Sequence, residues 1–175
     1  MRIFLAIELP KEIKDYLFDL EKKFKEAKIT WVSKKNLHVT LKFFGELKEE
    51  KVKEILTRLP KRKPFTMHLK KIGFFPNEKD PRVIWVSLEP EQEIIALQQA
   101  IDAEFLTDIK EEQKFQAHIT LGRIKSIRRK KDFLDSVQTI KIEHRVFIID
   151  SYQLISSKLS KLGPVYNTIK NVALS

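Results

Sequence analysis

Two short stretches of the sequence carry the residue types that acid–base chemistry requires. Residues 38–41 read His-Val-Thr-Leu, and residues 118–121 read His-Ile-Thr-Leu. The chain has four histidines, and two of them lie in these copies, one in each half of the chain. A single copy would mean little, but a repeat built on so uncommon a residue is hard to attribute to chance. We therefore treat the pair as the candidate functional centre.

The spacing within each copy suits a strand. Side chains alternate along a strand, so His38 and Thr40 face one way while Val39 and Leu41 face the other. The apolar pair can anchor in a core while the polar pair faces a cleft. Imidazole titrates near neutral pH, so one ring can act as base and the other as acid. Threonine hydroxyls can donate hydrogen bonds to phosphoryl oxygens. Two such strands can surround one small anion.

Other readings of these residues fit less well. Two buried strands could hold histidines that merely bond to the backbone, but packing alone does not explain a duplicated polar face. A zinc site would need cysteines or a helical histidine pair, and the chain has no cysteine at all. A Ser-His-Asp triad would need a nucleophile elbow, and none is present. The sequence also has no glycine-rich loop for nucleotide phosphates.

The remaining pattern predicts an α+β fold with mainly antiparallel sheets. Apolar residues at helical spacing alternate along the chain with stretches of strand character. We expect strands over residues 2–8, 30–32, 37–44, 65–72, 83–86, 115–124, 140–142 and 145–155, with a last strand after residue 166. We expect helices after Pro10, over residues 52–59, after Pro90 and over residues 131–137.

Composition indicates a single soluble domain with a polyanionic partner. The formal charge is +10, which favours RNA or DNA, although solubility or adaptation to heat would also explain it. The apolar runs are too short to cross a bilayer, so no membrane partner is expected. Residues Met1–Glu8 reach an acid too early for a signal peptide. We therefore expect a cytoplasmic protein.

At these motifs the sequence resembles the 2H phosphoesterase superfamily, and more closely the RNA 2′,3′-cyclic phosphodiesterase family, historically called 2′-5′ RNA ligases. The likeness covers nearly the whole chain. It is carried by residues 2–10, 31–32, 36–46, 75–76, 81–86, 115–123, 156–157 and 163–166. The family usually has proline where this chain has Ala117, which leaves the second motif whole.

The resemblance implies a bilobal fold. Each lobe would be an antiparallel sheet with helices packed outside, and a pseudo-two-fold axis would relate the lobes across a central cleft. Residues 1–175 would form a single two-lobed domain with one motif per lobe, His38–Leu41 and His118–Leu121. The implied reaction is hydrolysis of a 2′,3′-cyclic phosphate at an RNA end to a 2′-phosphate, without metal or other cofactor. Some family members also join tRNA halves through 2′-5′ linkages. We expect a monomer.

The resemblance also assigns roles to the motif residues. His118 would accept a proton from the attacking water, and His38 would donate one to the departing 3′-oxygen. Thr40 and Thr120 would steady the non-bridging oxygens. Without the resemblance, the sequence does not determine which of the two histidines is the acid and which is the base.

Neighbouring residues suggest further contacts with substrate. Lys42 continues the alternation of the first motif and could meet the RNA backbone, or it could be an ordinary solvated lysine. Arg123 falls on the outward face unless a bulge at Gly122 turns it inward. The family often has arginine there, so we expect it to neutralise phosphate. His68 and His144 lack a threonine partner, and we interpret them as ordinary residues.

Four aromatic residues could stack on a terminal base. They are Trp31, Phe44, Phe75 and Tyr166. Core packing is the alternative for each, and we expect it to hold for at least two.

Two other functions remain open. One is a 2H-type reaction on a small nucleotide or an ADP-ribose cyclic phosphate. The other is a non-catalytic RNA-binding module. The base preference at the RNA end, the physiological RNA and any need for a nucleotide are not specified by these patterns.

Overall fold

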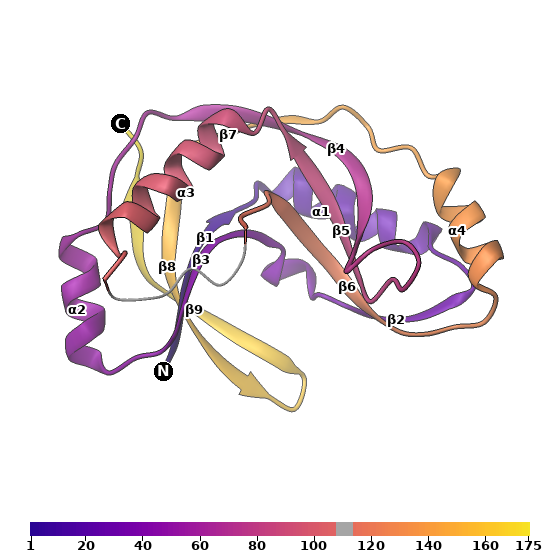
Figure 1. The fold of residues 1–175 in the computed structure, drawn as a ribbon, viewed down its shortest axis with the longest axis horizontal. Coiled ribbons are helices and arrows are strands. Elements are labelled where there is room, and N and C mark those ends of the chain that lie inside the picture. Colours follow the sequence, from indigo (N-terminus) through magenta and orange to yellow (C-terminus); the bar gives the residue numbers. More distant parts are fainter. Residues whose placement is uncertain (108–113) are drawn as a thin grey trace.

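The computed structural model describes residues 1–107 and 114–175 (Figure 1). The strands are β1 Arg2–Glu8, β2 Ala27–Trp31, β3 His38–Glu46, β4 Phe65–Phe75, β5 Val83–Glu89, β6 His118–Ile127, β7 Val146–Ile149, β8 Ser151–Ser160 and β9 Gly163–Ala173. The helices are α1 Lys11–Leu20, α2 Glu49–Thr57, α3 Gln92–Glu104 and α4 Lys130–Gln138, with short 3-10 turns at Glu21–Lys23 and Lys34–Asn36. Within these residues, no helix is long and apolar enough to cross a membrane.

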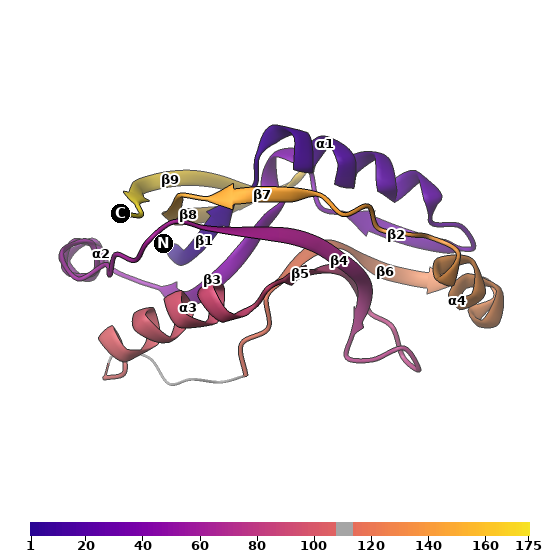
Figure 2. The same ribbon diagram turned by 90° about the horizontal axis from the view of Figure 1, so that it is seen from above.

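The strands form two antiparallel groups that meet at one point. Strands β9, β8, β1 and β3 follow one another in what we call the His38 half. Strands β7, β4, β5 and β6, with β2 paired to β6, form what we call the His118 half. A single backbone pair, Val39 with Ile119, joins β3 to β6 and makes one curled nine-stranded sheet of the described strands (Figure 2). The predicted antiparallel α+β fold is confirmed, with its two sheets joined edge to edge.

The chain crosses repeatedly between the two halves. It leaves β1 through α1 to reach β2, which pairs with β6, and then returns to β3. Helix α3 follows β5 in the His118 half but packs against β3 of the His38 half. In Figure 2, α1 lies on one side of the curled strands and α3 on the other. The two halves, joined edge to edge, are therefore also interlocked by the connections of the chain.

Alternation along β1 separates the core from a second, smaller apolar cluster. Ile3, Leu5 and Ile7 belong to the large core that includes the apolar stripe of α1. Phe4 and Ala6 point the other way, against Ile155 of β8 and Tyr166 of β9. The smaller cluster therefore lies beneath the face that carries the first histidine motif.

Strand β3 has a bulge directly after the first motif threonine. Thr40 lies opposite Ala6, but Lys42 lies opposite Leu5, so Leu41 is an extra residue. A bulge resets the alternation of side chains. Lys42 consequently points to the side of core-facing Leu5 rather than to the side of Thr40.

Strand β6 has the same bulge at the same point of the second motif. Thr120 lies opposite Trp85 and Gly122 lies opposite Ile84, with one extra residue between them. Arg123 then returns to the face of Thr120. The bulge expected next to Gly122 is therefore present.

Several segments differ from the sequence expectation; β6 begins at His118 rather than at residue 115, and β9 begins at Gly163, before the expected start after residue 166. Strand β4 continues to Phe75, where a loop was expected, because β5 supplies hydrogen-bonding partners along that stretch. Residues 140–142 form no strand, and their isoleucines instead pack against the core from outside the sheet. Residues 145–155 contain two strands, because the chain breaks at Asp150 between β7 and β8.

Gly122 allows β2 to approach β6 closely. A Cβ at this position would lie 2.8 Å from Cγ2 of Ile29 and 2.9 Å from the carbonyl oxygen of Thr30. Backbone cannot give way as a flexible side chain can, so an added methyl group must move the strands apart.

We expect Gly122→Ala to lower the free energy of unfolding by about 1–3 kcal/mol through this overpacking. Chemical denaturation at equilibrium measures the loss. Ser126→Ala, an exposed change on the same strand, is the matched control and should alter stability by less than about 0.5 kcal/mol. Equal stability of the two variants would show that β2 can withdraw from β6 freely.

Candidate active site

The pairing of Val39 with Ile119 fixes the register of the two motifs. Both side chains are buried in the large core. In an antiparallel pair, the residues before and after a matched position also face each other across the strands. The sheet face opposite the core therefore receives every polar residue of both motifs.

Four polar side chains consequently share one face of the sheet. The register places His38 across from Thr120 and Thr40 across from His118. The two histidines are diagonal neighbours, related by the local two-fold axis of the pair. One small group bound at this point can be reached by one imidazole and one hydroxyl from each half.

The His38 ring is fixed through both nitrogens. Its Nδ1 lies 2.6 Å from the carbonyl oxygen of Asn36. A carbonyl only accepts, so Nδ1 carries a proton and donates it. Its Nε2 lies 2.9 Å from Oγ1 of Thr40, and in the neutral ring Nε2 accepts from that hydroxyl. Nε2 is therefore the atom that gains and loses a proton.

The His118 ring is anchored in the same way. Its Nδ1 donates to the carbonyl oxygen of Gln116 at 2.7 Å, again two residues earlier in the chain. No residue in the described ranges hydrogen-bonds to Nε2 of His118. That nitrogen is free to bind a water molecule or a substrate.

The surroundings keep both rings neutral. Burial lowers the pKa of His38; the hydrogen bond to the Asn36 carbonyl opposes this, and the charges of His118 and Lys14 lower the pKa further. Burial likewise lowers the pKa of His118, against the opposing hydrogen bond to Gln116. An anion bound between the rings would raise both pKa values, because it stabilises the imidazolium form.

Aromatic side chains enclose the His38 ring. Phe4 of β1 lies 5.4 Å from it between ring centroids, and Tyr166 of β9 meets it edge-on at 5.6 Å. Tyr166 was a predicted substrate-stacking residue, whereas Phe4 was not singled out. The alternation of β1 contained the signal, since it separates Phe4 from core-facing Leu5.

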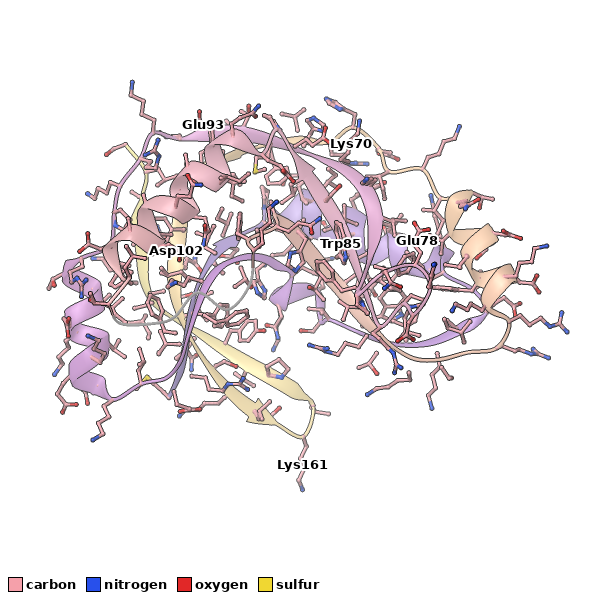
Figure 3. All side chains as sticks on the ribbon, viewed as in Figure 1. Lys70, Glu78, Trp85, Glu93, Asp102 and Lys161 are labelled. Atoms are coloured by element: carbon pink, nitrogen blue, oxygen red, sulfur yellow. The ribbon has the colours of Figure 1, made fainter. Side chains whose placement is uncertain are left out.

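A second aromatic pair encloses the His118 ring. Phe75 of β4 meets it edge-on at 5.0 Å, and Trp85 of β5 lies 6.0 Å away (Figure 3 labels Trp85). Phe75 and Trp85 stack on each other at 4.9 Å. Gly73 leaves room for the indole, since a Cβ there would lie 2.3 Å from it. Sequence reasoning missed Trp85, because its place depends on the pairing of β5 with β6, which sets Trp85 opposite Thr120.

Arg123 lies on the face of the two motifs without a partner of its own. Its side chain is exposed, and within the described residues it makes no ion pair or hydrogen bond. A free guanidinium next to Thr120 can bind a phosphate oxygen with two parallel N–H groups.

Lys42 does not join this group, contrary to the expectation from alternation. Its Nζ lies 2.6 Å from Oδ1 of Asp102 on α3, and its side chain is 9% exposed. Figure 3 labels Asp102. Gln98 donates to the other oxygen of the same carboxylate at 2.6 Å. The bulge after Thr40 turned the lysine toward α3, where it links the helix to β3.

Two of the four predicted stacking residues belong to the core. Phe44 is 7% exposed and meets Phe105 edge-on at 5.2 Å. Trp31 is partly buried against Phe24 at 5.4 Å. Among the described residues neither ring lies against His38 or His118, so packing explains both.

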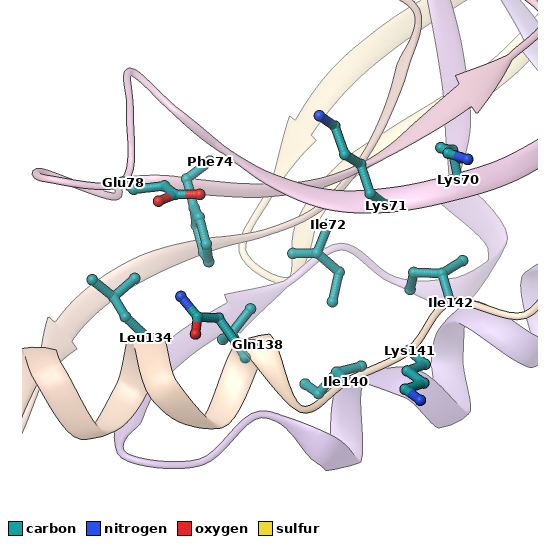
Figure 4. A pocket seen from close by; sticks show the side chains of 11 residues that line it. Lys70, Lys71, Ile72, Phe74, Glu78, Leu134, Gln138, Ile140, Lys141 and Ile142 are labelled. Atoms are coloured by element: carbon teal, nitrogen blue, oxygen red, sulfur yellow. The ribbon is translucent and has the colours of Figure 1, made fainter.

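Two cavities differ in their relation to the motifs. One of about 190 Å³ opens beside His38 and Tyr166. Another of about 510 Å³ lies between β4 and α4 and is lined in part by Phe74 (Figure 4). Because Phe74 and Phe75 point to opposite faces of β4, the larger cavity lies away from His118.

Within residues 1–107 and 114–175, no group of three or more His, Cys, Asp or Glu could hold a metal ion.

Comparison with known proteins identifies the fold and its repeat. The family model described as LigT like Phosphoesterase matches twice, over residues 7–85 and 86–166. Each match contains one histidine motif. The chain belongs to the LigT-like phosphoesterase family, as the resemblance of its motifs implied.

Curated relatives and solved structures match over nearly the full length. An RNA 2′,3′-cyclic phosphodiesterase of Methanocaldococcus jannaschii is 38% identical over 97% of this chain and 99% of its own. The protein of that name from Thermotoga maritima is 31% identical over 97% and 93%. TT0787 of Thermus thermophilus superposes with a TM-score of 0.83 at 26% identity, over 99% and 98% of the two chains. E. coli LigT complexed with 3′-AMP gives 0.80 at 25% identity, with the same coverage.

The pKa values of the motif histidines can be tested directly. We expect both rings to titrate below the ordinary value of about 6.5 in the free protein, and inorganic phosphate to raise both. Histidine NMR signals followed through a pH titration measure this, with His38→Gln and His118→Gln used for assignment. Values at or above the ordinary one without phosphate would contradict the neutral pair.

Proposed function

We propose that this chain hydrolyses the 2′,3′-cyclic phosphate end of RNA to a 2′-phosphate. The observation that carries the proposal is the matched anchoring of His38 and His118, each through Nδ1 and on one face of the sheet. The names of the nearly full-length relatives support the choice of substrate. The basic charge of the chain suits an RNA partner. We propose that the whole chain acts as one two-lobed catalytic unit.

In the proposed reaction, protons move at the two Nε2 atoms. Nε2 of His118 takes a proton from a water molecule as the water oxygen bonds to phosphorus. Nε2 of protonated His38 gives its proton to the 3′-oxygen as the bond between phosphorus and that oxygen breaks. Attack and departure lie roughly in line, so the acid and the base must act from opposite sides of the phosphorus. A later proton exchange with solvent restores both rings.

The surroundings of the two rings favour His118 as the base and His38 as the acid. The unshared Nε2 of His118 is free to hold the attacking water, whereas Nε2 of His38 is already bonded to Thr40. Burial lowers the pKa of His38, and a bound cyclic phosphate would raise it again, which would supply the protonated ring that the acid role requires.

Charge on the phosphoryl oxygens is met by hydroxyl and guanidinium groups. Thr40 and Thr120 flank the point where the two motifs meet, and Arg123 lies on the same face. Positioning and electrostatic stabilisation carry most of the rate in phosphoryl transfer. With a 5′-hydroxyl in place of water, the same displacement would form a 2′-5′ linkage between RNA pieces such as tRNA halves, His118 taking the hydroxyl proton and His38 giving one to the departing 3′-oxygen.

Each motif histidine should be essential to turnover. With a short RNA ending in a 2′,3′-cyclic phosphate and EDTA present, we expect His38→Ala and His118→Ala each to lower kcat by roughly 10²–10⁴-fold, because each removes an acid or a base. Chromatography of the products separates the 2′- from the 3′-phosphate. His68→Ala and His144→Ala are matched controls, because those rings contact each other outside the site.

The alternatives have distinct outcomes in that experiment. Retained RNA binding without any turnover in the unaltered protein would indicate a binding module. Turnover confined to mononucleotide or ADP-ribose cyclic phosphates would indicate another reaction of the superfamily. Full activity of either motif variant would refute the acid–base pair.

Arg123 should contribute through its charge. We expect Arg123→Met to lower kcat/KM by about 10²-fold, the typical loss when one donor to a developing oxyanion is removed. Arg123→Lys should recover part of it, because lysine keeps the charge but lacks the planar fork. Arg128→Met, an exposed arginine at the end of β6, is the control. Equal kinetics for Arg123→Met and Arg128→Met would remove Arg123 from the site.

A further inference from the structure

The cavity beside His38 has the character of a nucleobase pocket. At about 190 Å³ it is smaller than the usual site for a drug-sized ligand and suits one ring system. One part of its lining is apolar and includes Ile155, Val165 and the ring of Tyr166. Another part is polar and comprises Glu8, Gln153 and Thr168. Apolar walls with a few convergent polar groups are typical of specific small-molecule sites.

The polar groups are held in place by one another. Lys14 donates to Oε1 of Glu8 at 3.1 Å, and Nε2 of Gln153 donates to Oε2 of Glu8 at 3.0 Å. Thr168 donates to Oε1 of Gln153 at 3.2 Å, which fixes the orientation of the amide. Lys14 is itself tied to the carbonyl oxygen of Lys35 at 3.1 Å. The cavity therefore presents an ordered polar edge.

This edge keeps unused hydrogen-bonding capacity. An ionised carboxylate offers about four acceptor positions, and the contacts described occupy two of those on Glu8. The Glu8 side chain is 56% exposed, so the others are accessible. The amide of Gln153 has a second N–H beyond the one given to Glu8. The edge thus offers two acceptor atoms next to one donor.

The cavity lies where a terminal base must be placed. Glu8 is directly opposite His38 on the neighbouring strand, a separation of about 4.5–5.5 Å between Cβ atoms. In a 2′,3′-cyclic phosphate, the phosphorus and the base are attached to the same ribose, so the base lies beside one of the two histidines. The position equivalent to Glu8 in the His118 half is Ser87, whose hydroxyl already accepts from the backbone N–H of Lys71. The base-reading groups are therefore on the His38 side.

We propose that this cavity binds the terminal base of the RNA and that Glu8 and Gln153 select guanine. The proposal rests on the function proposed above. Guanine carries two adjacent donors, N1–H and the N2 amino group, which match the two oxygens of Glu8. Its O6 then accepts the free N–H of Gln153. Adenine, cytosine and uracil lack the two adjacent donors and make fewer of these bonds.

Nearby cations make a carboxylate compatible with an anionic substrate. The ammonium group of Lys14 bonds to Glu8, and Lys35 lines the same cavity. Their positive charges offset the repulsion that Glu8 would exert on the phosphate.

Four RNAs that differ only in the terminal base test the proposal. We expect kcat/KM to be about tenfold higher for guanine than for adenine, within the discrimination typical of one bidentate base contact. Glu8→Gln should bring the guanine-to-adenine ratio close to one, since an amide offers one acceptor atom in place of two. Gln153→Met should also reduce the ratio. Glu12→Gln, the same chemical change at an exposed position on α1, should leave the ratio unchanged.

The outcomes separate this proposal from the proposed function. Equal rates on all four RNAs, or a guanine preference that survives Glu8→Gln, would overturn the base pocket and leave the hydrolysis intact. Absence of hydrolysis on all four would overturn the proposed function. Calorimetry of guanosine 2′-phosphate against adenosine 2′-phosphate then tests the pocket independently, because tighter binding of the guanine compound should be lost in Glu8→Gln. Equal affinities would also reject the pocket.

Discussion

The candidate site depends on one backbone pairing, that of Val39 with Ile119. It is the only strand pairing in the described residues that joins the His38 half to the His118 half, and it sets the register of both motifs. A shift of either strand by one residue would turn the motif side chains of that strand to the opposite face and bury its imidazole in the core. The buried Val39 and Ile119 resist such a shift, because it would expose them. Core packing and the placement of the acid–base groups therefore rest on the same contact.

The backbone also determines which atom of each ring is chemically active. Carbonyl groups two residues before each histidine hold the proton on Nδ1, so Nε2 alone faces the shared sheet face with a lone pair. The two rings begin equal in this respect, and their surroundings make them unequal. Thr40 and Lys14 act on His38, whereas Nε2 of His118 has no such partner among the described residues. The two histidines are thus anchored in the same way, while their different neighbours suit them to different roles in the proposed reaction.

The pattern of the sequence predicted the antiparallel α+β fold, alternation predicted that the polar residues of each motif share a face, and the resemblance of the motif blocks predicted the family. Alternation failed at Lys42, because a bulge in β3 has no marker in the local sequence. The matching bulge in β6 could be anticipated, because Gly122 signals it. Aromatic character alone could not separate the core residue Phe44 from Phe75 beside His118, since both are flanked by apolar residues. That distinction depends on which strand lies next to which.

The interlocked path of the chain has a consequence for its synthesis. Strand β1 pairs with β8, more than 140 residues later, and β8 in turn pairs with β9. While the ribosome is still adding the last strands, β1 has no neighbour on the edge that β8 later occupies, and β9, which carries Tyr166, has not yet been made. Pairing across such separations is slow to form. Maturation of the His38 half must therefore wait for nearly the entire polypeptide, however early its motif emerges.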